Sequence, residues 1–217
     1  MKGNDRHSLQ MKNNYFLEKI RLLLKPMGFR YHRKGNTVLF HRGTLYGYNQ
    51  VYISQQVEEN VLSITPFFYT RINSINIFAN PFLGCPETLF NCNPTIGANL
   101  CNLGLENDIL SVRTTDDVEN ALFIFEGIME TNALPFFETL CCSAAIDLEL
   151  NRDARPKNLY LNDIIERPIV GTVAAMLNRN ERFSTLVKYY REMLSDTSTK
   201  IEMNYESLLE SLKIYCA

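Results

Sequence analysis

The residues with the clearest chemical potential in this chain lie close together near its N-terminus. Residues 28 to 43 read GFRYHRKGNTVLFHRG, and six of these sixteen residues are Arg, Lys or His. Cations neutralise the phosphates of a nucleic acid or the carboxylates of an acidic protein, and aromatic rings stack on bases or anchor protein interfaces. We therefore take this stretch as the first candidate binding surface.

Alternation of side chains along the predicted strands divides this region into two faces of a sheet. One face collects residues that a helix can cover: Phe29, Tyr31, Val38, Phe40, Val51, Ile53, Leu62, Ile64 and Phe68. The opposite face collects basic, polar and aromatic residues: Arg30, His32, Lys34, Tyr48, Gln50, Tyr52, Phe67 and Tyr69. Within the second set, the sequence predicts a partner-binding face at Arg30, His32, Lys34, Tyr48, Tyr52 and Tyr69.

Two alternatives for the same face stay open. In the first alternative the face has no binding role and is either covered by other elements or solvated, because Tyr and Phe are favoured in strands whatever the function. In the second alternative the face binds single-stranded nucleic acid. It carries no RNP-type Gly-aromatic motif, however, and the sequence pI of about 6.0 is lower than that of a typical nucleic-acid-binding domain.

The motifs of the common enzyme classes are missing from the sequence. It has no Walker A loop, no GxGxxG after a strand, no HExxH and no GxSxG. Its three histidines all lie in the N-terminal part, which leaves few places for a nucleophile–histidine pair. An enzyme that uses Cys141 or Cys142 is the remaining catalytic hypothesis, although a packed thiol on an amphipathic helix is commoner. The sequence predicts a protein with no catalytic residues and no cofactor.

The cysteines and the N-terminal sequence indicate the cellular compartment in which we expect the protein. Cys85, Cys92 and Cys101 are spaced by seven and nine positions, which fits neither paired zinc-ligand spacing nor a small disulfide scaffold. The N-terminus has no apolar segment of the kind found in secretory signals, and no apolar run approaches the ~18 residues of a membrane span. We expect reduced thiols, no metal, no membrane partner and a cytoplasmic location.

Charge is distributed unevenly along the chain. The net charge is only −2, yet residues 1–50 hold 10 of the 22 Lys and Arg residues and 2 of the 24 Asp and Glu residues. Such a division is typical of an electrostatic binding face. It is equally typical of a chain whose basic part lies against its own acidic part.

The first 70 residues predict a helix followed by an antiparallel meander. Apolar residues at helical spacing indicate a helix over residues 9–27, and Gly28 is suited to stop it. Alternation then indicates four strands, at residues 29–33, 37–42, 48–57 and 61–70. Their short connections favour antiparallel pairing.

The middle of the chain is less regular. Residues 71–110 mix Asn, Pro, Gly and Cys, and we predict one strand at residues 75–78 within a long irregular segment. The segment ILSVR indicates a short strand. A helix is expected over residues 116–131, capped by Asp116 with Glu119, and another from Pro135 to Leu148.

The polar segment NRDARPKN, residues 151–158, reads as a linker, and helices with apolar stripes follow it. The sequence therefore predicts an α+β domain over residues 1–150 and a helical extension over residues 151–217 that packs on it. The expected fold class is α+β, with an N-terminal helix on a mostly antiparallel sheet of four to six strands and a C-terminal helical subdomain.

Three short segments carry a resemblance to a known group of proteins. They are GFRYHRKGNTVLFHRG, ISQQ and ALPFFETL, and the matching positions are Gly28, Phe29, Arg33, Phe40, Gln55, Leu134, Pro135 and Phe136. In this order they resemble a group of uncharacterised bacterial α+β domains, over residues 9–148. Some members are encoded beside polymorphic toxins and are thought to act as immunity proteins. The resemblance implies a non-catalytic binder that covers the active face of a toxin.

Taken together, the sequence predicts a non-catalytic cytoplasmic module that binds another protein, with an immunity role implied by the resemblance. The alternatives are a nucleic-acid-binding regulator that uses the basic and aromatic sheet face, and an enzyme of unknown type.

Overall fold

The computed structural model describes residues 2–34, 37–152, 158, 160–161 and 163–216. Its contacts divide the chain into two compact units, each built from two separate segments. We call Met1–Tyr69 with Gly97–Glu138 the sheet unit, and Thr70–Ile96 with Thr139–Ala217 the helical unit. The predicted α+β class is confirmed, because helices at both ends of the chain accompany a mostly antiparallel sheet.

The sheet begins as a meander and then gains two short strands. Its strands are β1 (Arg30–Lys34), β2 (Thr37–Gly43), β3 (Gly47–Glu58), β4 (Val61–Ile72), β5 (Ile96–Ala98) and β6 (Leu110–Val112). The order is β1-β2-β3-β4-β5, and β6 pairs antiparallel with β4. β1 and β2 are antiparallel, as are β2 and β3. The four predicted strands of the meander and the short strand in ILSVR are therefore confirmed.

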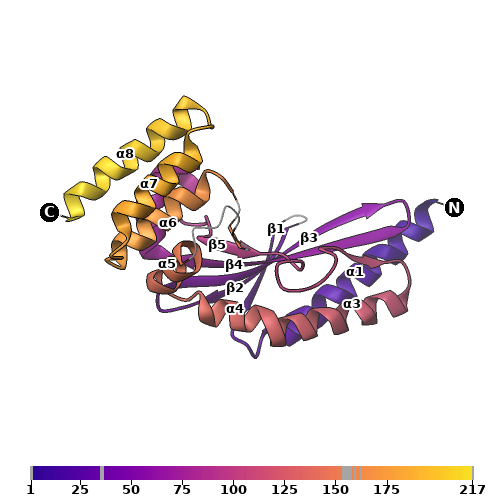
Figure 1. Cartoon of the computed structure of the whole chain (residues 1–217). Coiled ribbons are helices and arrows are strands. Elements are labelled where there is room, and N and C mark those ends of the chain that lie inside the picture. Colours follow the sequence, from indigo (N-terminus) through magenta and orange to yellow (C-terminus); the bar gives the residue numbers. More distant parts are fainter. Residues whose placement is uncertain (1, 35–36, 153–157, 159, 162, 217) are drawn as a thin grey trace. The chain divides into compact units, whose positions relative to one another are not determined.

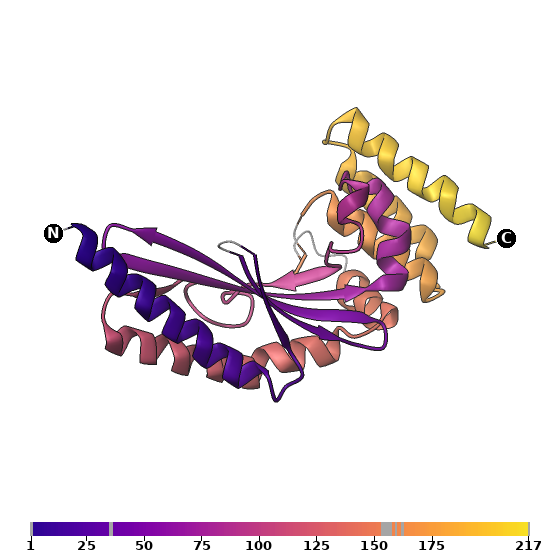
Figure 2. The same cartoon turned by 180° about the vertical axis from the view of Figure 1, so that it is seen from behind.

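α1 (Lys2–Leu24) lies along one face of this sheet (Figures 1 and 2). Its apolar side chains on that side are buried: Leu9, Phe16, Leu17, Ile20 and Leu24. The spacing of these residues is helical, so burial on the sheet rather than helix propensity explains why this segment is a helix.

α1 ends in a Schellman turn. Gly28 adopts φ 86°, its N–H donates to the carbonyl of Lys25 at 3.0 Å, and the N–H of Phe29 donates to the carbonyl of Leu24 at 3.2 Å. Glycine is favoured at this left-handed position because it has no Cβ. Gly28 follows the helix as predicted, although regular helix ends at Leu24 rather than at Met27.

α3 (Thr115–Ile128) packs against α1 on the same side of the sheet (Figure 1). The Thr114 side chain accepts from the backbone N–H of Asp117, and the Asp117 carboxylate accepts from the N–H of Thr114. This reciprocal pair is a capping box. The expected cap of Asp116 with Glu119 is wrong, because the helix begins earlier and Thr114 supplies the capping hydroxyl.

Aromatic rings join these helices to the sheet. The Phe125 ring of α3 lies 6.5 Å from Phe16 and 6.2 Å from Phe68, measured between centroids. Phe137, in the short helix α4 (Leu134–Thr139), lies 5.9 Å from Phe29 and 6.4 Å from Phe68. Burial of each such ring contributes about 1.5–3 kcal/mol. The sheet face that the sequence assigned to the core is the face covered by helices.

The helical unit contains α2 (Asn73–Ala79), α5 (Ser143–Asn151), α6 (Glu166–Leu177), α7 (Phe183–Leu194) and α8 (Thr199–Cys216). α6 packs against all four of the others, and every residue from Arg167 to Ala175 is buried. The predicted strand at residues 75–78 is wrong, since these residues belong to α2. The helix expected from Pro135 to Leu148 is two helices, α4 and α5.

Asparagine side chains organise the segment that the sequence left irregular. Asn76 donates to the carbonyl of Asn93 at 3.0 Å, and Asn80 donates to the carbonyl of Phe90 at 2.7 Å. Thr95 accepts from the N–H of Ile72 at 2.7 Å. These side chains are buried or half-buried, and they satisfy backbone groups that no helix or strand satisfies. The abundance of Asn here therefore has a structural explanation.

The division into units differs from the predicted domains 1–150 and 151–217. The helical unit includes α2 and α5, both of which lie before residue 151. Asn151 is buried, donates to the carbonyl of Gly171 at 2.9 Å and accepts from the Tyr190 hydroxyl at 2.6 Å. The start of the predicted linker is thus packed into the helical unit, while residues 153–157 lie outside the described part.

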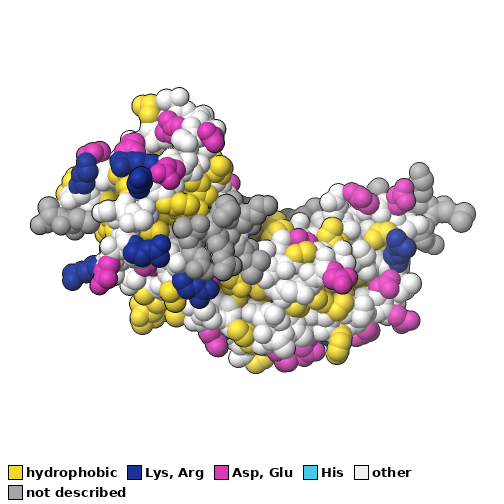
Figure 3. All heavy atoms as spheres, in the orientation of Figure 1, with side chains coloured by type: hydrophobic (Ala, Val, Ile, Leu, Met, Phe, Trp, Pro, Cys, Tyr) yellow, Lys and Arg dark blue, Asp and Glu magenta, His cyan; other side chains and the backbone are white. Residues whose placement is uncertain are grey.

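Charge is balanced in part within the sheet unit. The exposed side of α3 is acidic, with Asp116, Glu119 and Glu126, and Asp and Glu side chains gather over α3 in Figure 3. The basic helix α1 lies beside it, and the Tyr15 hydroxyl of α1 donates to Glu119 at 2.8 Å. None of the described helices is both long and apolar enough to cross a membrane.

Candidate functional site: the open face of the sheet

The face of the sheet opposite α1 and α3 is the candidate site. Alternation along β1 to β4 places on it a set of residues that we call the aromatic sheet face: Arg30, His32, Leu39, His41, Tyr48, Gln50, Tyr52, Phe67 and Tyr69. All of them are exposed or half-buried, whereas their sequence neighbours on the other face, such as Phe40, Val51 and Phe68, are fully buried. The helices of the sheet unit therefore leave this face accessible.

Strand register brings distant residues of this face into rows. Arg30 lies opposite His41, which lies opposite Gln50. His32 lies opposite Leu39, which lies opposite Tyr52. Directly opposed residues in an antiparallel pair point to the same side of the sheet. The basic residues of β1 therefore lie at one end of rows whose other end, on β3, is polar or aromatic.

Aromatic rings form a continuous group on β3 and β4. Tyr52 lies 5.9 Å from Phe67, and Phe67 lies 6.1 Å from Tyr69 with an interplanar angle of only 8°. On the neighbouring strands, the His41 ring lies 4.7 Å from the Tyr48 ring. Centroid separations in this range are those at which aromatic pairs attract one another. The rings therefore hold each other in place, and each stays half-buried rather than fully buried.

A glycine fixes the position of Tyr69. A Cβ built on Gly97 of β5 would lie 2.5 Å from the Tyr69 ring, so the ring occupies the space that any other side chain would need. Gly97 is half-buried and its backbone conformation does not require glycine. Its smallness matters because it lets the ring of Tyr69 lie flat against the sheet.

Few charged side chains lie on the described part of this face, and most of them are basic. Partial burial, followed by the nearby His32 and Arg30, lowers the pKa of His41 below its usual value, so its neutral form is favoured. Along β3 the first acidic side chain on this face is Glu58, at the hairpin end of the strand. Arg30 is the only Lys or Arg among the described side chains of the aromatic sheet face.

The structure brings together five of the six predicted site residues. Arg30 and His32 are exposed on β1, and Tyr48, Tyr52 and Tyr69 are half-buried on β3 and β4. The sixth, Lys34, is the last residue of β1 and its side chain lies outside the described part.

Sequence reasoning missed three residues of the site: Leu39 and His41 of β2, and Gly97 of β5. Alternation from Phe40 places His41 on the aromatic sheet face, and its pairing with Arg30 agrees, so this omission was avoidable. Gly97 could not have been found, because it reaches Tyr69 through a strand pairing 28 residues away in the chain.

No group of three or more His, Cys, Asp or Glu side chains in the described part is arranged to hold a metal ion. Cys141 and Cys142 are free and half-buried, and burial raises the pKa of Cys141, which disfavours the nucleophilic thiolate.

A hollow of about 630 Å³ lies between α3 and β6, and Asp108 and Asp117 are among the residues that line it. Each of these carboxylates already accepts hydrogen bonds from backbone N–H groups, of Cys101 in one case and of Arg113 and Thr114 in the other. Carboxylates satisfied in this way are explained by loop and helix capping.

No protein-family model matches the chain, and no curated protein or solved structure matches it significantly. The resemblance to bacterial α+β domains therefore stays a prediction from three short segments.

Proposed function

We propose that this protein is a non-catalytic binding module that holds an acidic protein partner on the aromatic sheet face. The observation that carries the proposal is the accessible group of rings formed by Tyr52, Phe67 and Tyr69, with Arg30 and His32 at the β1 end of the same face. Tyr and Arg are the residue types that most often dominate binding energy at protein interfaces. A partner with a carboxylate opposite Arg30 complements the charge of this face.

The composition of the face favours a protein over nucleic acid. Interface centres are enriched in aromatic residues and Arg and depleted in Lys, Asp and Glu, which describes this surface. Nucleic-acid binding draws most of its free energy from Lys and Arg that neutralise several phosphates. Arg30 is the one Lys or Arg among the described side chains of the face, and the lowered pKa of His41 favours its neutral form.

The identity of the partner follows from the resemblance alone and not from the geometry. If the resemblance holds, the partner is a toxin and the module neutralises it by covering its active face. This immunity role and the cytoplasmic location stay predictions.

The test compares affinity capture from the native lysate by three forms of the full chain, each run with and without nuclease. The forms are wild type, the double variant Tyr52→Ser with Tyr69→Ser, and the control Phe123→Ser, which changes a 76% exposed ring on α3. We expect wild type and the control to retain one stoichiometric protein after nuclease, which also binds when purified. The double variant is expected to lose it.

Two results would overturn the proposal. Equal capture by the double variant would show that the rings are not the binding surface. Recovery of nucleic acid whose release depends strongly on salt, with the proteins lost after nuclease, would assign the face to single-stranded nucleic acid instead.

A further inference from the structure

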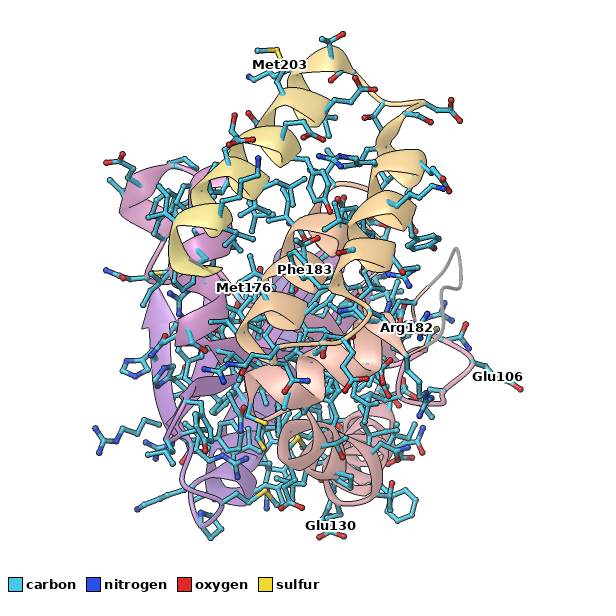
Figure 4. The ribbon with its side chains drawn as sticks, turned by 60° about the vertical axis from the view of Figure 1, so that its left-hand side comes forward. Glu106, Glu130, Met176, Arg182, Phe183 and Met203 are labelled. Carbon is cyan, nitrogen blue, oxygen red and sulfur yellow. The ribbon has the colours of Figure 1, made fainter. Side chains whose placement is uncertain are left out.

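The helical unit contains an apolar hollow of about 630 Å³ that the sheet face does not involve. It is lined by Phe78 of α2, by the C-terminal turn and following residues of α6, and by Phe183 at the start of α7. Figure 4 labels two of its lining residues, Met176 and Phe183, which lie close together at the ends of α6 and α7. This volume lies within the range of small-molecule sites.

One charged residue lines this hollow, and its backbone is unusual. Arg179 adopts φ 52°, a left-handed backbone conformation that residues other than glycine rarely adopt. The N–H of Arg179 donates to the carbonyl of Met176 at 3.0 Å, and the N–H of Asn180 donates to the carbonyl of Ala175 at 2.9 Å. α6 therefore ends in a Schellman turn with Arg179 at the position that glycine normally takes.

The same turn occurs elsewhere in this chain with the expected residue. Gly28 after α1 and Gly104, at φ 98°, hold the left-handed position, and the N–H groups of Phe29 and Leu105 complete the two turns. Arg179 departs from this pattern where the turn borders an apolar hollow. A residue kept in an unfavourable conformation beside a cavity points to a role for its side chain.

Hydrogen bonds to a buried carboxylate hold this turn in place. The carboxylate of Asp147, which is buried, accepts from the amide of Asn178 at 2.7 Å and from the amide of Asn180 at 2.9 and 3.0 Å. These two residues flank Arg179 directly. The guanidinium of Arg179 has no carboxylate partner within the described part of the chain. Among the described residues, the rim of the hollow thus presents a cation with no carboxylate partner on a fixed turn.

We propose that this hollow binds a small molecule with an apolar chain and one carboxylate, the chain resting on Phe78, Met176 and Phe183 and the carboxylate pairing with Arg179. The apolar lining accounts for the chain, and charge complementarity accounts for the carboxylate. The site is independent of the partner proposed for the aromatic sheet face.

The test is a calorimetric titration of the full chain with sodium decanoate below its micelle concentration, and with decanol as the neutral comparison. The informative variant is Arg179→Gly, because glycine suits φ 52° and so removes the cation without harming the turn. We expect one saturable decanoate site in wild type, and about fivefold weaker decanoate binding in Arg179→Gly. Decanol binding is expected to stay the same, and the Tm to stay the same or rise.

Two further variants sharpen the result. Arg179→Lys keeps the charge and is expected to retain most of the decanoate affinity, while Phe183→Ala is expected to weaken decanoate and decanol alike. The absence of saturable decanoate binding to wild type overturns the proposal, and so does equal decanoate affinity of wild type and Arg179→Gly. Arg179 lies on an exposed turn, so these two outcomes stay readable even if Phe183→Ala does not fold.

Discussion

Each of the two units packs a tyrosine directly over a glycine, and the two tyrosines have opposite surroundings. In the sheet unit the Tyr69 ring lies over Gly97, is half-buried and belongs to an accessible group of rings. In the helical unit a Cβ on Gly171 would lie 2.3 Å from the Tyr190 hydroxyl, and Tyr190 is fully buried and donates to Asn151 at 2.6 Å.

The comparison separates a tyrosine that is partly accessible to a partner from one that is buried in the core. Burial raises the pKa of Tyr190, so its hydroxyl stays protonated and links α7 to α5. Tyr69 is held by its contacts in one position with part of its surface accessible. A preorganised ring of this kind binds a partner without a further loss of conformational freedom, which is the property expected of an interface anchor.

The largest effect on stability is expected in the buried hydrogen-bond network of the helical unit. Asp147→Ala removes a buried carboxylate that accepts from the amides of Asn151, Asn178 and Asn180. The buried amide of Asn151, the half-buried amide of Asn180 and the exposed amide of Asn178 then lose a charged acceptor, so the free energy of unfolding should fall by about 3–5 kcal/mol. Urea unfolding measures this, with the exposed Asp196→Ala as the control. A change no larger than that of the control would mean that the network does not stabilise the unit.

The two glycines provide the next comparison. Gly171→Ala forces the buried Tyr190 to move and should cost about 1–3 kcal/mol by overpacking, whereas Gly97→Ala should cost less than about 1 kcal/mol because Tyr69 can turn toward solvent. Thermal and urea unfolding of both variants measure the difference. If Gly97→Ala proves the more destabilising, Tyr69 is part of the core and not a displayed ring.

A smaller, kinetic effect is expected at the basic end of the aromatic sheet face. Arg30→Glu reverses the charge that faces an acidic partner, so the association rate should fall several-fold and depend less on salt, while dissociation changes little. Surface-based kinetics with the purified partner at two salt concentrations measure this. Lys25→Glu, which changes an exposed residue after α1, is the control. Equal rates for both variants would remove Arg30 from the interface.

The smallest expected effect is on the stability of the protein at acidic pH. The pKa of His41 is lower in the folded chain than its usual value of about 6.5, so the unfolded chain binds more protons between the two values. Stability therefore rises with pH through that window and declines as the pH falls below about 6.5. His41→Asn should show a smaller loss of Tm between pH 7 and pH 5 than wild type. His32→Asn, which removes one of the groups that lower the His41 pKa, should show a loss between these two. An unchanged loss of Tm in His41→Asn would contradict the assignment.

Most of the sheet unit could be predicted because its signals are local. Alternation along β1 to β4 assigned the buried and accessible faces, and five of the six predicted site residues were found together. The predicted cap of α3 was wrong for a local reason. Thr114 and Asp117 satisfy the capping pattern as well as Asp116 and Glu119 do, and the helix begins at the first pair.

The helical unit could not be predicted in the same way, since it is assembled from distant segments. Residues 75–78 alternate like a strand, yet they form α2, where Asn76 reaches Asn80 one helical turn away and Asn93 in a later loop. Asn151 looked like the start of a solvated linker because its partners, Gly171 and Tyr190, lie 20 and 39 positions further on. Periodicity carries no information about such contacts.

The most direct test of the central claim is hydroxyl-radical footprinting of the full chain, free and bound to its purified partner. The account predicts that Tyr52, Phe67 and Tyr69 react in the free protein and become protected in the complex, while Phe123 on α3 reacts equally in both. Unchanged reactivity of the three rings in a saturated complex would contradict it, because the partner would then bind elsewhere.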